Sequence, residues 1–250
     1  MFHTLAFRGT VALVANTALA GIQDDIISLN PSTNRFMLPE AMNLYLATAF
    51  SATINRARIN TPSYRLLTLP NIRPVQTGLR PTDLNIMQSF LDQPLRIPEN
   101  EDLSVEATSD VGAGGEPVTA ILFLGPQLEP IPPGDIYTMR ATATGTATAN
   151  LWTTMSITMD DTLPPGRYAM LASEHISATG YAHRWIVPNQ FYRPGNLSNI
   201  TLGARANWWM TNRMMGAYGT FLNTVIPQLQ VLCTAADASH TLFLQLVRVS

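Results

Sequence analysis

The sequence contains no lysine, so all 15 of its cationic side chains are arginine. Charged residues of both signs make up only 13% of the chain, about half the share of an ordinary soluble domain. Free-standing proteins cover their surface largely with lysine and glutamate, whereas arginine tolerates desolvation and suits interfaces. The composition therefore indicates a surface much of which contacts other protein. The absence of lysine also excludes P-loop, Schiff-base and kinase-type chemistry.

Other absences exclude further classes of protein. A single cysteine, Cys233, excludes an intrachain disulfide. No stretch of 18 uninterrupted apolar residues is present, which excludes a membrane-spanning helix. The formal net charge of −2 argues against direct, charge-driven binding of nucleic acid. An apolar run from Thr10 to Ala20 imitates a signal peptide, but Asn16 and Thr17 interrupt it, which weighs against secretion.

Recognisable catalytic motifs are missing as well. G-x-S-x-G does not occur, and the four histidines (His3, His175, His183 and His240) show neither H-x-H nor HExxH spacing. We therefore predict no enzymatic activity, no cofactor and no metal site. The competing enzyme hypothesis requires His175, His183 and His240, or the acidic residues, to converge in one cleft.

The part of the chain after about residue 95 alternates strands with turns. Proline–glycine punctuation at 132–134, 164–166 and 194–195 separates apolar segments. The predicted strands are Leu103–Thr108, Val118–Leu124, Ile136–Ala143, Ala147–Met159, Arg167–Ser173, Ala182–Val187, Val225–Cys233 and Thr241–Val249. The last two flank a polar segment and predict a C-terminal hairpin.

A two-residue period runs from Met139 to Asp160, with apolar residues at odd positions and mostly threonine at even ones. One strand of that length would span about 70 Å, so a turn near Gly145 is expected. Eight strands without helix alternation predict a mainly β, antiparallel β-sandwich of single jelly-roll type over residues 61–250. A double jelly roll would need about sixteen strands, which leaves little room.

Residues 1–60 have a different pattern and predict an N-terminal arm with one helix. Pro39 and Glu40 suit a helix start, and apolar residues then recur at helical spacing until Arg58. A second short helix is expected around Thr82 to Leu91.

The charge is arranged in blocks, because arginines dominate from Phe50 to Arg96 and only acids follow from Ile97 to Asp135. The two blocks either fold back on each other within one molecule or set the register between copies. The candidate subunit-interface residues are Arg56, Arg58, Arg65, Arg73, Arg80, Arg96, Glu99, Glu101, Asp102, Glu106, Trp208 and Trp209.

The segments Leu163-Pro-Pro-Gly-Arg-Tyr168, Ser177-Ala-Thr-Gly-Tyr-Ala-His-Arg184 and Arg193-Pro-Gly195, followed by the apolar C-terminal strands, resemble the jelly-roll capsid proteins of icosahedral viruses, especially tailless phages. The resemblance covers roughly residues 95–250. It implies a shell-forming virion protein whose N-terminal arm touches neighbouring subunits. Only Arg8 and Arg35 precede residue 56, so a basic genome-binding tail is missing, and contact with an inner membrane or other virion proteins is more plausible.

Our leading hypothesis is therefore a capsid subunit that assembles with copies of itself into an icosahedral shell and is located in the virion. The alternative is a glycan- or receptor-binding β-sandwich on a virion or cell surface. That alternative uses aromatic side chains as a stacking platform, namely Trp152, Trp185, Phe191, Tyr192, Trp208 and Trp209. Such residues also serve as core or interface in sandwich proteins.

Overall fold

The computed structural model describes residues 1–12, 16–51, 54–65, 71–72, 87–109, 115–199 and 215–250. Within these ranges the chain forms 19 strands and one short helix, α1 (Pro62–Arg65). No helix in the described part is long and apolar enough to cross a membrane. The predicted mainly β class is confirmed, whereas the predicted N-terminal helical arm is wrong.

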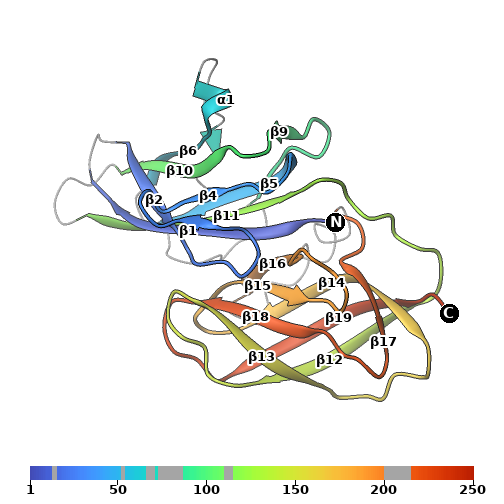
Figure 1. The fold of residues 1–250 in the computed structure, drawn as a ribbon. Helices are drawn as coiled ribbons and strands as arrows, with labels where there is room; N and C mark the ends of the chain where they lie inside the picture. The colour runs from blue at the N-terminus through green and yellow to red at the C-terminus, as the bar shows by residue number, and fades with distance from the viewer. Residues whose placement is uncertain (13–15, 52–53, 66–70, 73–86, 110–114, 200–214) are drawn as a thin grey trace. The chain divides into compact units, whose positions relative to one another are not determined.

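The strands belong to two compact units (Figure 1). The N-terminal unit comprises Leu5–Pro126, and the C-terminal unit comprises Gln127–Ser250 together with Met1–Thr4. The division therefore falls at residue 126 and not at residue 60. Residues 5–60, most of the segment that we predicted to be a separate arm, belong to the N-terminal unit and contain six of its strands or parts of them.

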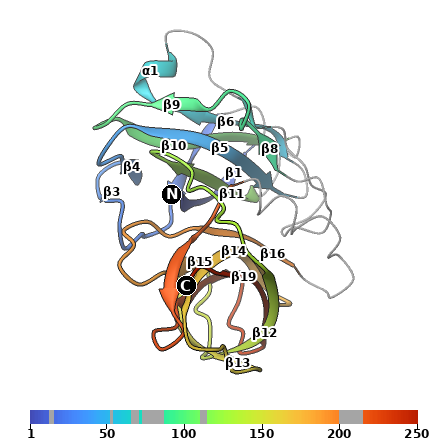
Figure 2. The same cartoon turned by 90° about the vertical axis from the view of Figure 1, so that its right-hand side faces the viewer.

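The described part of the C-terminal unit has eight strands besides the start of β1. They are β12 (Ile136–Thr144), β13 (Trp152–Met159), β14 (Arg167–Ile176), β15 (Gly180–Ile186), β16 (Gly195–Asn199), β17 (Gly219–Leu222), β18 (Gln228–Cys233) and β19 (His240–Arg248). They form two halves, one with the order β12-β19-β14-β17 and the other with the order β13-β18-β15-β16. Pairing of β12 with β13 and of β14 with β16 closes a ring, which Figure 2 shows end-on.

The eight strands pair from the outside of the sequence inward. The first strand, β12, pairs with the last, β19, and β13 pairs with β18; β14 then pairs with β17, and β15 with β16. A long antiparallel ribbon folded over on itself produces this order, which is that of a jelly roll. Because consecutive strands other than β15 and β16 thereby fall into opposite halves, residues that are far apart in the sequence meet inside the unit.

The N-terminal unit repeats the same order with different residues. Its strands are β1 (His3–Val11), β2 (Thr17–Gly21), β3 (Leu29–Asn30), β4 (Arg35–Met37), β5 (Met42–Phe50), β6 (Ile54–Asn60), β7 (Asn71–Ile72), β8 (Gln88–Ser89), β9 (Leu95–Ile97), β10 (Asp102–Ser109) and β11 (Glu116–Gly125). One half runs β1-β11-β5-β8 and the other β2-β10-β6-β7, while β3 and β4 form a hairpin on β10 and β9 pairs with β5. The chain thus holds two such sandwiches where we predicted one.

The predicted helix from Pro39 to Arg58 is instead two strands, β5 and β6. All but one residue of β5 are buried, since both faces of this strand are covered. A strand buried on both faces is a continuous apolar run, and such a run also satisfies helical spacing. Of the second predicted helix, residues 82–86 lie outside the described residues, and Gln88–Ser89 is the strand β8.

All eight predicted strands are confirmed, with shifts at their ends. The expected turn at Gly145 is also found: β12 ends at Thr144, and Gly145 has a φ of 135°, a conformation that favours glycine. The predicted C-terminal hairpin is wrong, because β18 pairs with β13 and β15 while β19 pairs with β12 and β14. The polar segment between them carries the chain from one half of the jelly roll to the other.

Candidate functional site

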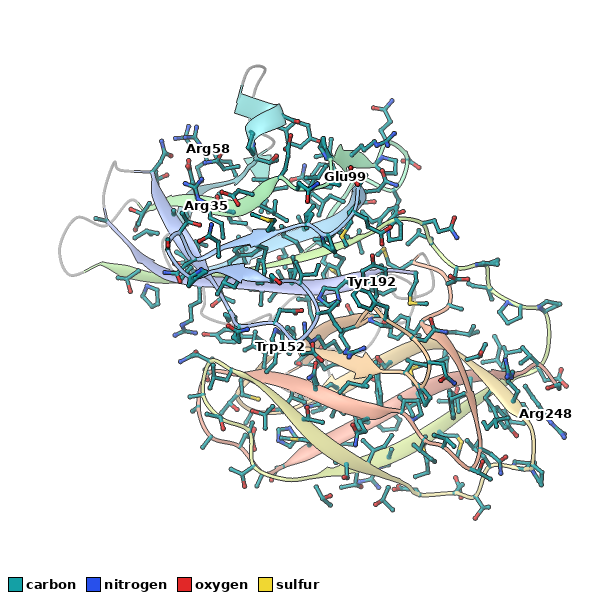
Figure 3. The ribbon with its side chains drawn as sticks, viewed as in Figure 1. Arg35, Arg58, Glu99, Trp152, Tyr192 and Arg248 are labelled. Atoms are coloured by element: carbon teal, nitrogen blue, oxygen red, sulfur yellow. The ribbon has the colours of Figure 1, made fainter. Side chains whose placement is uncertain are left out.

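The predicted charge blocks meet on neighbouring strands of the N-terminal unit. Arg58 on β6 stands opposite Glu106 on β10, and both its Nε and Nη2 donate to the Glu106 carboxylate, at 3.0 and 2.9 Å. Asn60 donates to the other carboxylate oxygen. For this pair the blocks fold back within one molecule, one of the two alternatives that the sequence left open. Figure 3 labels Arg58.

Glu101 anchors the short helix α1. Its carboxylate accepts hydrogen bonds from the hydroxyls of Thr61 and Ser63 and from the Ser63 backbone N–H. Burial opposes ionisation of Glu101, but these hydrogen bonds outweigh it and hold the pKa of its carboxyl below the usual value. The Tyr64 hydroxyl adds a bond of 2.7 Å to the Arg96 carbonyl. Glu101 is therefore engaged within its own unit.

The remaining candidate interface residues fall into two groups. The side chains of Arg56, Arg96 and Glu99 are exposed, and that of Asp102 is half-buried; Arg56 donates to the Asn16 side chain at 2.6 Å. The other candidates lie outside the described residues, or have side chains that do: Arg65, Arg73, Arg80, Trp208 and Trp209. Arg56, Arg96 and Glu99 are the described members of this group whose charged side chains are exposed to solvent.

Three histidines converge inside the C-terminal unit. His175 on β14 lies between the other two, with its ring centroid 5.5 Å from that of His183 on β15 and 5.2 Å from that of His240 on β19. His175 Nε2 is 3.0 Å from His240 Nδ1. All three are at most 2% exposed. The convergence that the enzyme hypothesis required is present, but it lies in the interior rather than in a cleft.

The surroundings keep the imidazoles of His175 and His183 neutral. Burial lowers the pKa of His175 well below its usual value, and the nearby His183 and His240 lower it further. Burial also lowers the pKa of His183 to about 3. A general base works best with a pKa near the operating pH, so neither residue suits that role. Among the described residues no group of histidine, cysteine and acidic side chains is arranged to hold a metal ion.

Serine hydroxyls extend the histidine cluster across the sandwich. Ser198 Oγ lies 2.7 Å from His175 Nδ1, and Ser173 Oγ lies 2.7 Å from His183 Nε2. Trp185 Nε1 donates to Ser173 Oγ at 2.8 Å. No sequence motif joins these histidines. A weaker signal lies in residues that are two positions apart in a strand, because such residues point to the same face of the strand. Ser173 and His175 share one face of β14 in this way, and His183 and Trp185 share one face of β15.

A hollow of about 770 Å³ opens on the C-terminal unit beside this cluster. His240 is the histidine that lines it, together with the side chains of Arg140 and Phe243 and several hydroxyl groups. Arg140 is 3.5 Å from Asp160, and the side chains of this ion pair are largely exposed. The hollow therefore combines one aromatic ring, one guanidinium group and several hydrogen-bonding hydroxyls.

The proposed aromatic platform is mostly occupied within the C-terminal unit. Trp185 is fully buried and Tyr192 is 6% exposed. The guanidinium carbon of Arg184 lies 4.2 Å from the ring centroid of Trp152, which is labelled in Figure 3. Of the described members, Phe191 stays open to solvent, at 57% exposure. Trp208 and Trp209 lie outside the described residues.

Comparison with protein-family models and with curated proteins finds no match to this sequence. Among solved structures, the chain is similar to the crystal structure of the major capsid protein P2 from bacteriophage PM2. The similarity covers 100% of this chain and 98% of that one, at 13% sequence identity and a TM-score of 0.25. Similarity at that level carries no argument about fold or function, and none of the proposals below depends on it.

Proposed function

We propose that this chain is a structural virion protein, a capsid subunit that assembles with copies of itself into an icosahedral shell. The observation that carries the proposal is the occurrence of the jelly-roll strand order twice in one chain. Jelly rolls serve as capsid, lectin and cupin scaffolds. A fold alone does not decide between these uses. The choice therefore depends on the chemistry of the protein's surface and interior.

The composition of the surface favours assembly. Only 13% of residues are charged and none is lysine. The C-terminal unit also exposes large apolar side chains at Ile131, Ile136, Phe191, Leu222 and Val225, each at least 40% exposed. Exposed large apolar side chains on a poorly charged surface are typical of proteins that form interfaces. Contacts between copies would cover them.

The interior of the C-terminal unit weighs against an enzymatic or cupin-like use. Its three clustered histidines are buried and bonded to one another or to serine hydroxyls. Burial lowers the pKa of His175 and His183, which keeps these two imidazoles neutral. We therefore propose no enzymatic activity and no cofactor. With a net charge of −2, we propose further that the genome is not bound directly, that the protein resides in the virion, and that its other partners are virion proteins or an inner membrane.

The state of assembly tests the proposal. Purified full-length chain is expected to form shells or capsomers that are visible by negative-stain electron microscopy and that sediment faster than a 27.4 kDa monomer. Particles from infected cells are expected to contain hundreds of copies. A monodisperse monomer at high concentration, with no association with particles, contradicts the proposal.

A charge reversal sharpens the same test. Arg96→Glu places an acid where the exposed part of the basic block now lies, and like charges at an interface cost several kcal/mol. We expect the concentration needed for assembly to rise by about tenfold or more. The matched control is Asp161→Arg, a reversal at an exposed acid outside both blocks. An equal effect of the two variants argues against a role for the charge blocks between copies.

The glycan- or receptor-binding alternative is favoured by one observation, the hollow lined by Phe243, Arg140 and hydroxyl groups. An aromatic ring beside hydrogen-bonding hydroxyls is a suitable surface for a sugar. Retention of the purified chain on a glycan array, abolished by Phe243→Ala without loss of folding, would establish this alternative. No retention is the result expected for a shell subunit.

A further inference from the structure

All four histidines of the chain belong to the C-terminal unit, and the N-terminal unit has none. Three of them form the buried cluster described above. The cluster joins strands from both halves of the jelly roll, because β14 and β19 lie in one half and β15 and β16 in the other. The bonds from His175 to Ser198 and from Ser173 to His183 each cross from one half to the other.

The direction of these hydrogen bonds is fixed at one end. His240 Nε2 lies 3.0 Å from the Asp237 carbonyl oxygen, which only accepts, so Nε2 carries the proton. In neutral His240 the other nitrogen, Nδ1, is then an acceptor, and His175 Nε2 must donate to it. His175 Nδ1 is left as an acceptor for the hydroxyl of Ser198. The chain of bonds thus runs in a single direction from Ser198 to Asp237.

An added proton disturbs this chain wherever it binds. On His240 Nδ1 it faces the N–H of His175, so two donors oppose each other. On His175 Nδ1 it turns the acceptor into a donor, so the Ser198 hydroxyl has to rotate and accept instead. Either way a charge is created in the interior, with another imidazole ring centroid within 6 Å, and an unpaired buried charge is strongly unfavourable.

The other titratable groups around the cluster offer little compensation. From β15, Tyr181 shares the face of His183; from β18 comes Cys233; and Tyr218 precedes β17. Asp237 is the acid nearest to His240, but its carboxylate accepts from Ser177, Thr179 and the Ser239 backbone. The adjacent Glu174 and Arg184 point to the opposite faces of their strands, toward Asn199 and Gln230 respectively.

We propose that the histidine cluster is an acid-sensitive link: protonation of His175 or His183 disrupts the bonds between the two halves of the C-terminal jelly roll and loosens that unit while the N-terminal unit stays folded. His240 is the member nearest to solvent, since it lines the hollow beside the cluster. The link does not depend on the proposed function, because a chain that forms no shell would show it equally.

The sign of the effect follows from where the protons bind. In the unfolded chain a histidine titrates near 6.5, whereas His175 and His183 stay neutral in the folded unit far below that value. The stabilisation from keeping them neutral is complete above pH 6.5 and is lost as the pH falls. Protonation of His183 in the unfolded chain raises the unfolding constant about 30-fold at pH 5, and His175 adds to this effect in the same direction. For His183 the loss continues down to about pH 3.

Tryptophan fluorescence provides a selective readout, because all four tryptophans lie between residues 152 and 209 and the N-terminal unit has none. We expect urea unfolding of the full chain, followed by this signal, to shift to much lower urea between about pH 7.5 and pH 5. A midpoint that does not change over this range overturns the proposal.

His183→Gln keeps a polar group near Ser173 but cannot be protonated. We expect this variant to show an acid response about 30-fold smaller in the unfolding constant at pH 5. The matched control is Leu229→Ala, which removes a fully buried side chain opposite Trp185 and should lower stability equally at every pH. A His183→Gln variant with the full wild-type acid response refutes the assignment.

A measurement on the unaltered chain covers the case in which the variant does not fold. Hydrogen exchange by mass spectrometry, corrected for the intrinsic rate at each pH, is expected to show lost protection in residues 167–199 and 228–248 on acidification, and unchanged protection in the strands of the N-terminal unit. Equal loss in both units, or none in either, contradicts the proposal.

Discussion

The N-terminal unit links its strands with carboxylate and guanidinium groups at partly exposed positions, whereas the C-terminal unit links its halves with imidazole and hydroxyl groups in its interior. The Arg58–Glu106 pair is 25% and 15% exposed, while His175 and His183 are fully buried. Both units nevertheless have the same strand order. The order of strands therefore does not require a particular polar chemistry, since apolar burial and backbone pairing maintain it in both units.

The polar groups determine instead how the stability of each unit responds to salt and pH. A partly exposed ion pair is screened by salt and depends on carboxylates, which titrate near pH 4. A buried imidazole cluster is shielded from salt and titrates near pH 6.5 in the unfolded chain. The two units are therefore expected to fail under different conditions. Three substitutions examine that contrast.

The largest effect is expected at Arg184, which is fully buried in the C-terminal unit. Its Nε donates to Gln230 at 2.7 Å, and Nη1 donates to the Thr4 carbonyl at 3.1 Å. Arg184→Met keeps most of the aliphatic volume but leaves these acceptors without their donor. We expect the C-terminal unit to lose about 3 kcal/mol of unfolding free energy, measured by urea unfolding with tryptophan fluorescence.

The matched control for this change is Arg248→Met, at an exposed arginine of the same unit that donates to the Pro165 carbonyl. It should shift stability by less than about 0.5 kcal/mol. An equal loss of unfolding free energy in the two variants would mean that a buried arginine stabilises this unit no more than an exposed one. The contrast between interior and surface polar groups would then be wrong.

A smaller effect is expected for Arg58→Ala in the N-terminal unit. Since both partners of the Arg58–Glu106 pair are partly exposed, we expect a loss of about 1 kcal/mol, most of it removed by high salt. A double-mutant cycle with Glu106→Ala isolates the pair, and hydrogen exchange of β6 and β10 reports on it. A coupling energy that high salt does not reduce would show that this pair is shielded from solvent in the same way as the buried groups of the C-terminal unit.

The smallest effect is expected for Glu101→Gln, and it concerns pH. The folded-state pKa of Glu101 lies below its usual value near 4.5, so the carboxylate contributes stability above that pH and loses it as the pH falls further. Glu101→Gln should therefore slightly lower the stability of the N-terminal unit near pH 6, where the carboxylate contributes fully, and remove part of the fall in stability below about pH 4.5. A change in the slope of stability against pH between pH 5 and pH 7 would contradict the separate acid windows of the two units.

Sequence patterns were most informative where the signal is local. The alternation of apolar and threonine residues along β12 and β13, and the proline–glycine turns, located every predicted strand after residue 100. They failed at β5, where burial on both faces produces an apolar run that spacing cannot distinguish from a helix. That misassignment accounts for two of the six strands in the first 60 residues; the other four were not predicted either, which concealed the second jelly roll.

The candidate site shows the same division. Blocks of opposite charge pointed to Arg58 and Glu106, but only strand pairing showed that they meet within one molecule. The histidines gave no sequence motif, because the spacing of two along β14 and β15 indicates a shared face and not which faces meet. His175 and His240 are 65 residues apart in the sequence.

The sequence by itself determined the β class, the positions of the later strands and the low-charge, lysine-free surface, because alternation, turn residues and composition act over a few residues. Only the tertiary structure decided which strands pair, that the chain has two units, and that three histidines share one interior. Those features depend on contacts between distant segments, and the pairing of first strand with last brings together residues that no local pattern relates.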